Sequence, residues 1–252
     1  MMADQRHMYQ KIAWDIREQI RTGELRPETK IPSLNQLMET YKVSYATAQT
    51  AVALLRSWGL VPTEQGAGTF VLPGKPVVEL MTSVLVAGTR EAYSWRDTAA
   101  EFGVSGSQVI ANTGLVMAPP DVADAFGYDA DTPVTWRERH IKADGDTVQI
   151  AISYFAAEVA EAMPELGRPG RLRKWAAGLM AQAGWVVVMT SDMVTARLAT
   201  DDEAVIFGFD VGSAVSEMFR TCSDASGSII MIERNVSNSA RIRQVWHSKP
   251  EG

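Results

Sequence analysis

The stretch VSYATAQTAVALLRSWGLVPTEQGAGTFV, residues 43–71, predicts a short helix followed by a β-hairpin with a glycine-rich tip. Ser44 is a typical helix N-cap. Ala48, Val52 and Leu55 recur at helical spacing and predict the buried face. The apolar segments on either side of QGAG predict the two strands of a wing. A helix followed by a wing is the shape of a DNA-reading module, although this stretch contains a single basic residue.

Two helices are predicted upstream of this stretch. In MYQKIAWDIREQIRTGEL, Ile12, Ile16 and Ile20 recur every four residues and predict an apolar stripe of a helix over residues 8–21. In IPSLNQLMETYKV a second helix follows Ser33 as its N-cap. Its predicted buried face consists of Leu34, Leu37, Met38 and Tyr41. KVS then leaves room only for a tight turn, so the second and third helices form a helix-turn-helix.

The composition favours two domains. The chain has 252 residues, of which 46 % are hydrophobic, enough for a sizeable core. The net charge of −6 is uneven: residues 1–75 carry nine Lys/Arg against seven Asp/Glu, and residues 76–252 carry fifteen against twenty-three. A contact with nucleic acid is therefore predicted in the first third, although the positive excess there is small.

Several classes of site and location are disfavoured. The single cysteine, Cys222, excludes an intramolecular disulfide and a cysteine-based metal site. Three scattered histidines do not favour zinc, so we expect neither a metal nor a cofactor. The N-terminal MMADQRHMYQK lacks the apolar segment of a secretory signal, and no run approaches the length of a membrane span. We therefore expect a cytoplasmic protein without a membrane partner.

The domain boundary is predicted near residue 75, where LPGKPVVE brings two prolines and a glycine. Residues 1–75 are expected to form the winged helix-turn-helix, residues 76–91 a linker, and residues 92–252 a second, mixed domain. Its clearest element is PVTWRERHIKADGDTVQIAISYF, a hairpin that turns at DGD. SQVIANTGLVM and WVVVMTSDMVTARL predict strands, PPDVADAFG, KWAAGLMAQAG and TDDEAVIFG predict helices, and two or three strands surround DASG.

The first domain resembles the N-terminal domain of GntR-type bacterial transcription regulators. The resemblance rests on YQKIAWDIREQIRTGEL, IPSLNQL, YKVSYATAQTAVALLRSWGLV and QGAGTFV, in that order and spacing. It implies a homodimer that binds a two-fold operator of double-stranded DNA. The candidate DNA-binding residues are Lys11, Ser33, Asn35, Ser44, Tyr45, Thr47, Gln49, Arg56, Gln65, Gly66 and Gly68.

The departures from that family leave two interpretations. Asn35, Tyr45 and Gln49 stand where the family commonly has charged residues, chiefly arginines, and the wing carries no basic residue at its glycines. In the first interpretation neutral side chains read the DNA, since glutamine can bond bidentately to adenine. In the second, the domain keeps its fold but has lost operator affinity, because each missing phosphate contact removes roughly one unit of salt dependence.

The second domain resembles the UTRA effector domain of the HutC subfamily. The resemblance rests on WRERHIKADGDTVQIAISYF, QAGW and FRTCSDASGSIIMIERNVSNSARIRQVW. It implies an α+β fold with an antiparallel sheet, similar to chorismate lyase, so that the whole chain is a multi-domain α/β protein. It also implies a small effector and dimerisation through this domain.

The effector candidates centre on Arg137 and Arg139, which alternate on one strand and so share a face. Spacing alone favours a solvated face, whereas UTRA domains use an R-x-R pair at this place to hold the ligand. Two guanidinium groups suit a phosphate or a carboxylate, so a phosphosugar or an organic acid is expected. Glu233 is alternatively a salt-bridge partner of Arg220 or Arg241. The candidates are Ser94, Arg96, Arg137, Arg139, Ser153, Tyr154 and Glu233.

An enzyme is the less favoured class. The likeness to chorismate lyase makes catalysis by the arginines conceivable, but a lyase does not need a helix-turn-helix. The sequence shows no nucleophile–base pair, P-loop, dinucleotide fingerprint or metal cluster. We expect a regulator, most simply a repressor, with a ligand-sensing or partner-binding protein that no longer binds DNA as the alternative.

Overall fold

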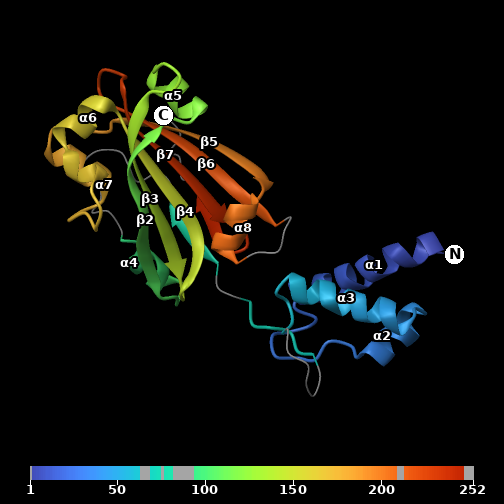
Figure 1. The fold of residues 1–252 in the computed structure, drawn as a ribbon. Coiled ribbons are helices and arrows are strands. Elements are labelled where there is room, and N and C mark those ends of the chain that lie inside the picture. Colours follow the sequence, from blue (N-terminus) through green and yellow to red (C-terminus); the bar gives the residue numbers. More distant parts are fainter. Residues whose placement is uncertain (1, 63–68, 75–76, 82–93, 209–212, 247–252) are drawn as a thin grey trace, which may run out of the picture. The chain divides into compact units, whose positions relative to one another are not determined.

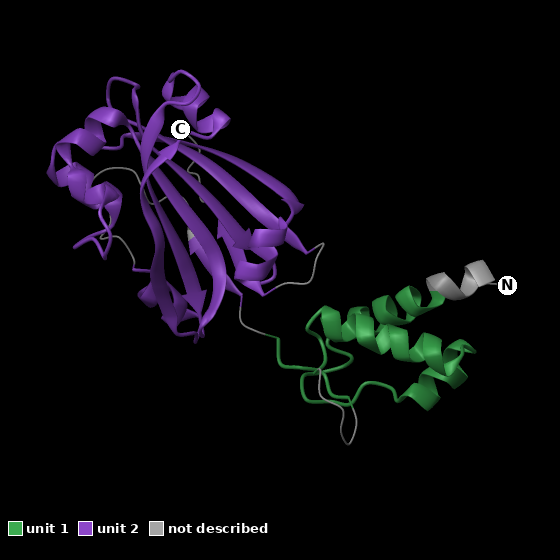
Figure 2. Cartoon of the chain, viewed as in Figure 1, with its two compact units in different colours: residues 1–75 green, residues 76–252 purple. Residues whose placement is uncertain are grey.

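The computed structural model divides the chain into two compact units, residues 1–75 and 76–252 (Figure 2). The structure describes residues 2–62, 69–74, 77–81, 94–208 and 213–246. Gln65, Gly66 and Gly68 of the predicted wing tip lie outside the described residues.

The first unit is built on three helices: α1 (Met2–Arg21), α2 (Leu34–Tyr41) and α3 (Tyr45–Ser57) (Figure 1). α1 begins earlier than residue 8, because a helix extends through polar residues without needing an apolar stripe. The predicted N-caps of α2 and α3 are confirmed, and Ser33 forms a capping box with Gln36. Lys42, with φ of 52°, makes the left-handed turn that separates α2 from α3.

The core of the first unit joins the faces predicted from the helical spacing. Ile12, Ile16, Leu37, Val52 and Leu55 are all buried in one cluster. Beside it, residues 69–72 run next to residues 28–31 and Leu60, three residues after α3, through backbone bonds of 2.8–2.9 Å. These contacts form the base of a wing, in the position that the sequence predicts.

The second unit is a six-stranded antiparallel sheet in the order β2-β3-β4-β7-β6-β5. Its strands are β2 (Gly106–Met117), β3 (Pro133–Ala143), β4 (Asp146–Phe155), β5 (Met189–Leu198), β6 (Ala214–Ser223) and β7 (Ile229–Asn238). The predicted hairpin is confirmed as β3 and β4. Its turn consists of Asp144 and Gly145, both with positive φ, which matches the right-handed twist of the strands.

A second, two-stranded sheet pairs β1 (Val78–Met81) with β8 (Ile242–Val245) in parallel. β1 lies inside the stretch that the sequence assigns to a linker, because its apolar residues show no clean period. The remaining elements are α4 (Trp95–Glu101), α5 (Pro120–Phe126), α6 (Ala157–Ala162), the 3-10 helix η1 (Pro164–Gly167), α7 (Ala176–Gln182) and α8 (Asp201–Phe207).

The two faces of the six-stranded sheet are covered by different elements. On one face, Phe155, Cys222 and Met231 pack with α6, η1 and α7, while Ile141 and Ala151 pack with α4, β1 and β8. On the opposite face, clusters around α5 and α8 bury the alternate residues of β4, β6 and β7. The first face therefore has two apolar clusters, and between them lie the candidate effector residues Arg137, Arg139, Ser153 and Glu233.

Candidate functional site

A row of polar residues crosses all six strands on the face that carries the two apolar clusters. The strand register places them directly opposite one another, so that each is the cross-strand neighbour of the next. We call this set the polar row: Thr113, Arg137, Ser153, Glu233, Arg220 and Asp192. Six aligned polar side chains in the middle of a sheet face are costly for stability, which points to a functional reason for them.

Arg137 is a loop anchor in this structure. Its side chain is only 2 % exposed. Its guanidinium donates to the backbone carbonyls of Leu166, Arg168 and Gly170 at 2.9–3.3 Å, which holds the segment after η1 against the sheet. Burial, with a smaller contribution from the charge of Arg139, lowers the pKa of Arg137. One of the two guanidinium groups expected to face a ligand is thus bonded to backbone carbonyls in this structure, and its contact with a ligand stays a prediction.

Arg139 has the bonding capacity that Arg137 lacks. Its Nε is buried without a hydrogen-bond partner among the described residues. One terminal nitrogen lies 3.3 Å from the Ser153 hydroxyl and 3.7 Å from Glu233 Oε1, the second distance being too long for a hydrogen bond. The Arg139 and Glu233 side chains are 23 % and 16 % exposed. A partly open, incompletely bonded cation and carboxylate thus lie together with the buried hydroxyl of Ser153.

Beyond Glu233 the row continues into a tightly bonded part. Arg220 donates to both carboxylate oxygens of Asp192 at 2.6 Å. Asp192 also accepts a 2.9 Å bond from the indole of Trp246, which follows β8. Burial acts to raise the pKa of Asp192, but the bonds from Arg220 and Trp246 outweigh it and lower that pKa. The sequence indicates Arg220 only as a possible partner of Glu233 and does not single out Asp192 or Trp246, since it does not predict the register of β5 and β6.

Three other effector candidates do not join this group. Tyr154 neighbours Ser153 in sequence and therefore points to the opposite face, where it is buried in an apolar cluster and burial raises its pKa. Ser94 caps α4: its hydroxyl accepts from the Asp97 backbone and donates to the Asp97 carboxylate. Arg96 is exposed on α4. The structure thus brings together Arg137, Arg139, Ser153 and Glu233 from the predicted set.

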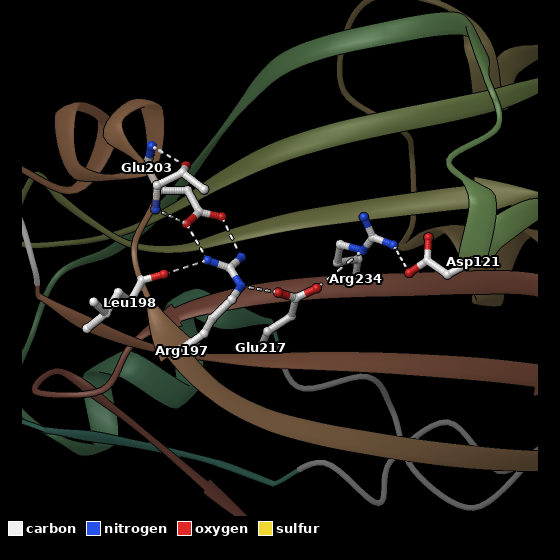
Figure 3. Close-up of polar contacts among 7 residues, drawn as sticks. Asp121, Arg197, Leu198, Glu203, Glu217 and Arg234 are labelled. Atoms are coloured by element: carbon white, nitrogen blue, oxygen red, sulfur yellow. Dashed lines mark hydrogen bonds and ion pairs between the residues drawn. The ribbon is translucent and has the colours of Figure 1, made fainter.

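The opposite face carries a chain of ion pairs that the sequence does not reveal (Figure 3). Arg197 of β5 bonds Glu203 of α8 at 2.7 Å and also bonds Glu217 of β6. Arg234 of β7 then lies 3.5 Å from Glu217 and bonds Asp121 of α5. This chain connects α8 to α5 across the sheet, so we interpret it as a structural clamp for the two helices.

The DNA candidates of the first unit separate into exposed readers and capping residues. Asn35, Tyr45 and Gln49 are exposed at the beginnings of α2 and α3, and Tyr45 is 53 % exposed. The hydroxyls of Ser33 and Ser44 accept helix N–H groups as caps. Neutral side chains therefore form the exposed surface at these two helix starts.

Most of the remaining DNA candidates contact other residues of the first unit. Thr47 contacts the Ser44 hydroxyl at 2.9 Å, and Arg56 donates to the Pro62 carbonyl at 3.2 Å, at the start of the wing. Arg17 stacks over the rings of two tryptophans, whereas Lys11 is exposed on α1. Of the two basic DNA candidates, Lys11 is therefore exposed, whereas Arg56 is bonded to backbone.

Within the described ranges, no three or more His, Cys, Asp or Glu residues are grouped so that they could hold a metal ion. Across those same ranges, no helix has both the length and the apolarity needed to cross a membrane.

Comparison with known proteins gives matches for both units. The family model of bacterial regulatory proteins, gntR family, matches residues 8–71, and the model of the UTRA domain matches residues 103–243. An uncharacterized HTH-type transcriptional regulator of Streptomyces coelicolor is 26 % identical over 259 residues, covering 97 % of this chain and 93 % of the relative. The repressor NagR of Bacillus subtilis is 32 % identical over 87 residues, 34 % of this chain and 35 % of NagR.

Solved structures agree in fold. A GntR-family transcriptional regulator superposes with a TM-score of 0.64 at 23 % identity, covering 97 % of this chain and 98 % of that chain. PhnF from Mycobacterium smegmatis superposes with a TM-score of 0.57 at 18 % identity, covering 95 % and 100 % of the two chains. The arrangement of a winged helix-turn-helix and a six-stranded sheet in one chain is thus found in known regulators.

Proposed function

Because the chain belongs to the GntR-type transcription regulators that carry a UTRA domain, we propose that it is an effector-responsive repressor. In this proposal a homodimer binds a two-fold DNA operator in the cytoplasm, and a small anion bound to the second unit changes that affinity. The repressor role is supported by NagR and by the mannosyl-D-glycerate system repressor MngR of Escherichia coli, which is 38 % identical over 64 residues.

The observation that carries the effector proposal is the bonding state of Arg139. A buried guanidinium N–H without a partner costs free energy, roughly 1–3 kcal/mol. An anionic ligand on Arg139 removes this cost, and a phosphate or carboxylate has the lone pairs to do so. Ser153 can bond the same anion, and Glu233 can accept from a hydroxyl of the ligand. Phosphosugars and hydroxylated organic acids both have this combination of groups.

The homodimer proposal is supported by the edge strand β5. β5 pairs only with β6 among the described strands, which leaves one side of its backbone unpaired. Its side chains are unusually apolar for an edge: Met189, Met193, Val194 and Leu198 are all exposed, Met193 by 63 %. A long apolar edge strand is a template for pairing with another chain. A second copy that covers β5 would bury these residues.

A second candidate function follows from the neutral reading surface. With Asn35, Tyr45 and Gln49 exposed and Arg56 engaged by backbone, the first unit offers few cations to phosphates. A ligand-sensing or partner-binding protein without operator affinity fits the same observation. A gel shift with the DNA upstream of the protein's own gene, at low salt, separates the two. Binding that random DNA does not compete supports the repressor, and its absence at low salt supports the alternative.

A further inference from the structure

The first and last described strands of the second unit form one ribbon. β1 follows the boundary between the two units, and β8 lies near the end of the chain. They pair in parallel, with Val78 opposite Ile242, and Glu79 forms an ion pair with Arg243 at 2.9 Å. The ribbon is thus the part of the second unit that is joined directly to the chain coming from the winged helix-turn-helix.

This ribbon crosses the face of the sheet that carries the polar row. Val78 and Ile242 pack in the apolar cluster with residues of β3 and β4. Trp246, four residues after Ile242, reaches Asp192 on β5. Four extended residues span about 13 Å, and the three strand spacings from β4 to β5 span about 14 Å, so the lengths agree. One end of the ribbon therefore packs over β3 and β4, and the other is bonded to the edge strand.

Aligned charged residues lead from the proposed effector site to this ribbon. Glu233 lies 3.7 Å from Arg139, and the strand register places it opposite Arg220 in the polar row. Arg220 is bonded to Asp192, and Asp192 to Trp246. Burial acts to lower the pKa of Arg220, but Asp192 and the charge of Glu233 together raise it. Arg220 is therefore bonded to one acid, Asp192, and lies opposite a second acid, Glu233, on the neighbouring strand.

We propose that Arg220, Asp192 and Trp246 are positioning residues that couple the effector site to the β1–β8 ribbon. This inference rests on the proposed effector site. An anion on Arg139 weakens the attraction between Arg139 and Glu233, so the carboxylate of Glu233 turns toward Arg220. Arg220 then shares its charge between Glu233 and Asp192, and the hold of Asp192 on Trp246 changes. The ribbon shifts between two arrangements, and its N-terminal end carries that shift into the chain leading to the DNA-binding unit.

The test is a double-mutant cycle on the full-length protein that needs no effector. Glu233→Gln perturbs one end of the contacts, and Trp246→Phe removes the indole donor at the other while keeping an aromatic ring. Hydrogen–deuterium exchange of residues 78–81 and 242–245 is measured in the wild type, both single variants and the double variant. We expect Glu233→Gln to change these exchange rates by a factor of about five in the wild-type background and by much less in the Trp246→Phe background.

Two additions make the result decisive. Trp175→Phe, at a tryptophan of similar exposure on another part of the unit, is the matched control and should leave the Glu233→Gln effect intact. Asp192→Asn interrupts the same contacts at Asp192 and should likewise reduce the Glu233→Gln effect. An equal Glu233→Gln effect with and without Trp246, or no effect on the ribbon at all, overturns the coupling. Inorganic phosphate, added as a probe, should slow exchange around residues 151–153 and 233. Failure there counts against the effector site alone, because the cycle is measured without a ligand.

Discussion

Replacing each arginine of the R-x-R pair by methionine should give opposite phenotypes. Arg137→Met removes every guanidinium bond to the segment after η1, including the bond to the buried carbonyl of Leu166. A buried carbonyl left without its hydrogen bond costs about 1–3 kcal/mol. Loss of the bonds to Arg168 and Gly170, which are exposed residues, adds about 1 kcal/mol together. Removal of a buried charge returns part of this, so we expect a net loss of about 2 kcal/mol.

Arg139→Met should leave stability almost unchanged. The substitution removes one 3.3 Å hydrogen bond and one 3.7 Å ion pair, but it also removes a buried N–H that has no partner among the described residues. These effects oppose each other, and the net change should stay within about 1 kcal/mol. The loss should instead appear in ligand binding, because the proposed anion contact disappears.

Differential scanning calorimetry and a thermal-shift screen of phosphosugars and hydroxy acids measure both effects. For a unit of this size about 1 kcal/mol shifts the melting temperature by 2–4 °C, so Arg137→Met should lower it by about 4–8 °C and Arg139→Met by less than about 4 °C. Compounds that stabilise the wild type should still stabilise Arg137→Met but not Arg139→Met. Equal destabilisation by both substitutions would refute the division of roles, as would an unchanged ligand response in Arg139→Met.

Three further outcomes are expected. Gln49→Ala should weaken binding to a preferred DNA sequence by about 1–3 kcal/mol relative to random DNA in a competition gel shift, whereas Gln10→Ala on α1 should not; equal loss on both DNAs would contradict base reading. Met193→Glu should convert the dimer to a monomer in light scattering, and Val109→Glu on the other edge strand should not; a dimeric Met193→Glu would exclude β5 as the interface. Hydrogen bonds from its arginine partner lower the pKa of Glu203, so their stabilisation is present above about pH 4.5 and is lost as the pH falls below it. Glu203→Gln should therefore flatten the decline in melting temperature between about pH 5 and 3.

The sequence predicts the elements whose pattern is local. Ser33 and Ser44 mark their helices because a cap needs only the next three residues, and DGD marks its hairpin because the turn itself requires positive φ. β1 is missed because a four-residue strand that pairs with residues far along the chain has no local signal of its own. The same reason explains why Asp192 and Trp246 do not stand out in the sequence.

The candidate site shows what alternation can and cannot predict. Alternation places Arg137 and Arg139 on one face, and that is confirmed. It cannot show that the guanidinium of Arg137 is bonded to the carbonyls of a segment about thirty residues later, because that depends on how η1 packs. Alternation also argues against Tyr154, since a residue next to Ser153 in a strand must face the other way. A contact between Tyr154 and the effector therefore stays a prediction of the family resemblance alone.

The position of Asp192 links the proposed effector site to the proposed dimer edge. Asp192 lies on β5, the strand whose other side chains form the exposed apolar edge, and it also holds Arg220 and Trp246. A change in the polar row can therefore act on the β1–β8 ribbon and on the dimer contact through one carboxylate. In the proposed repressor the exposed start of α3 is neutral, so operator affinity depends strongly on both copies binding together. A small shift in either the ribbon or the dimer edge is then enough to control it, since a weak single contact gives little affinity on its own.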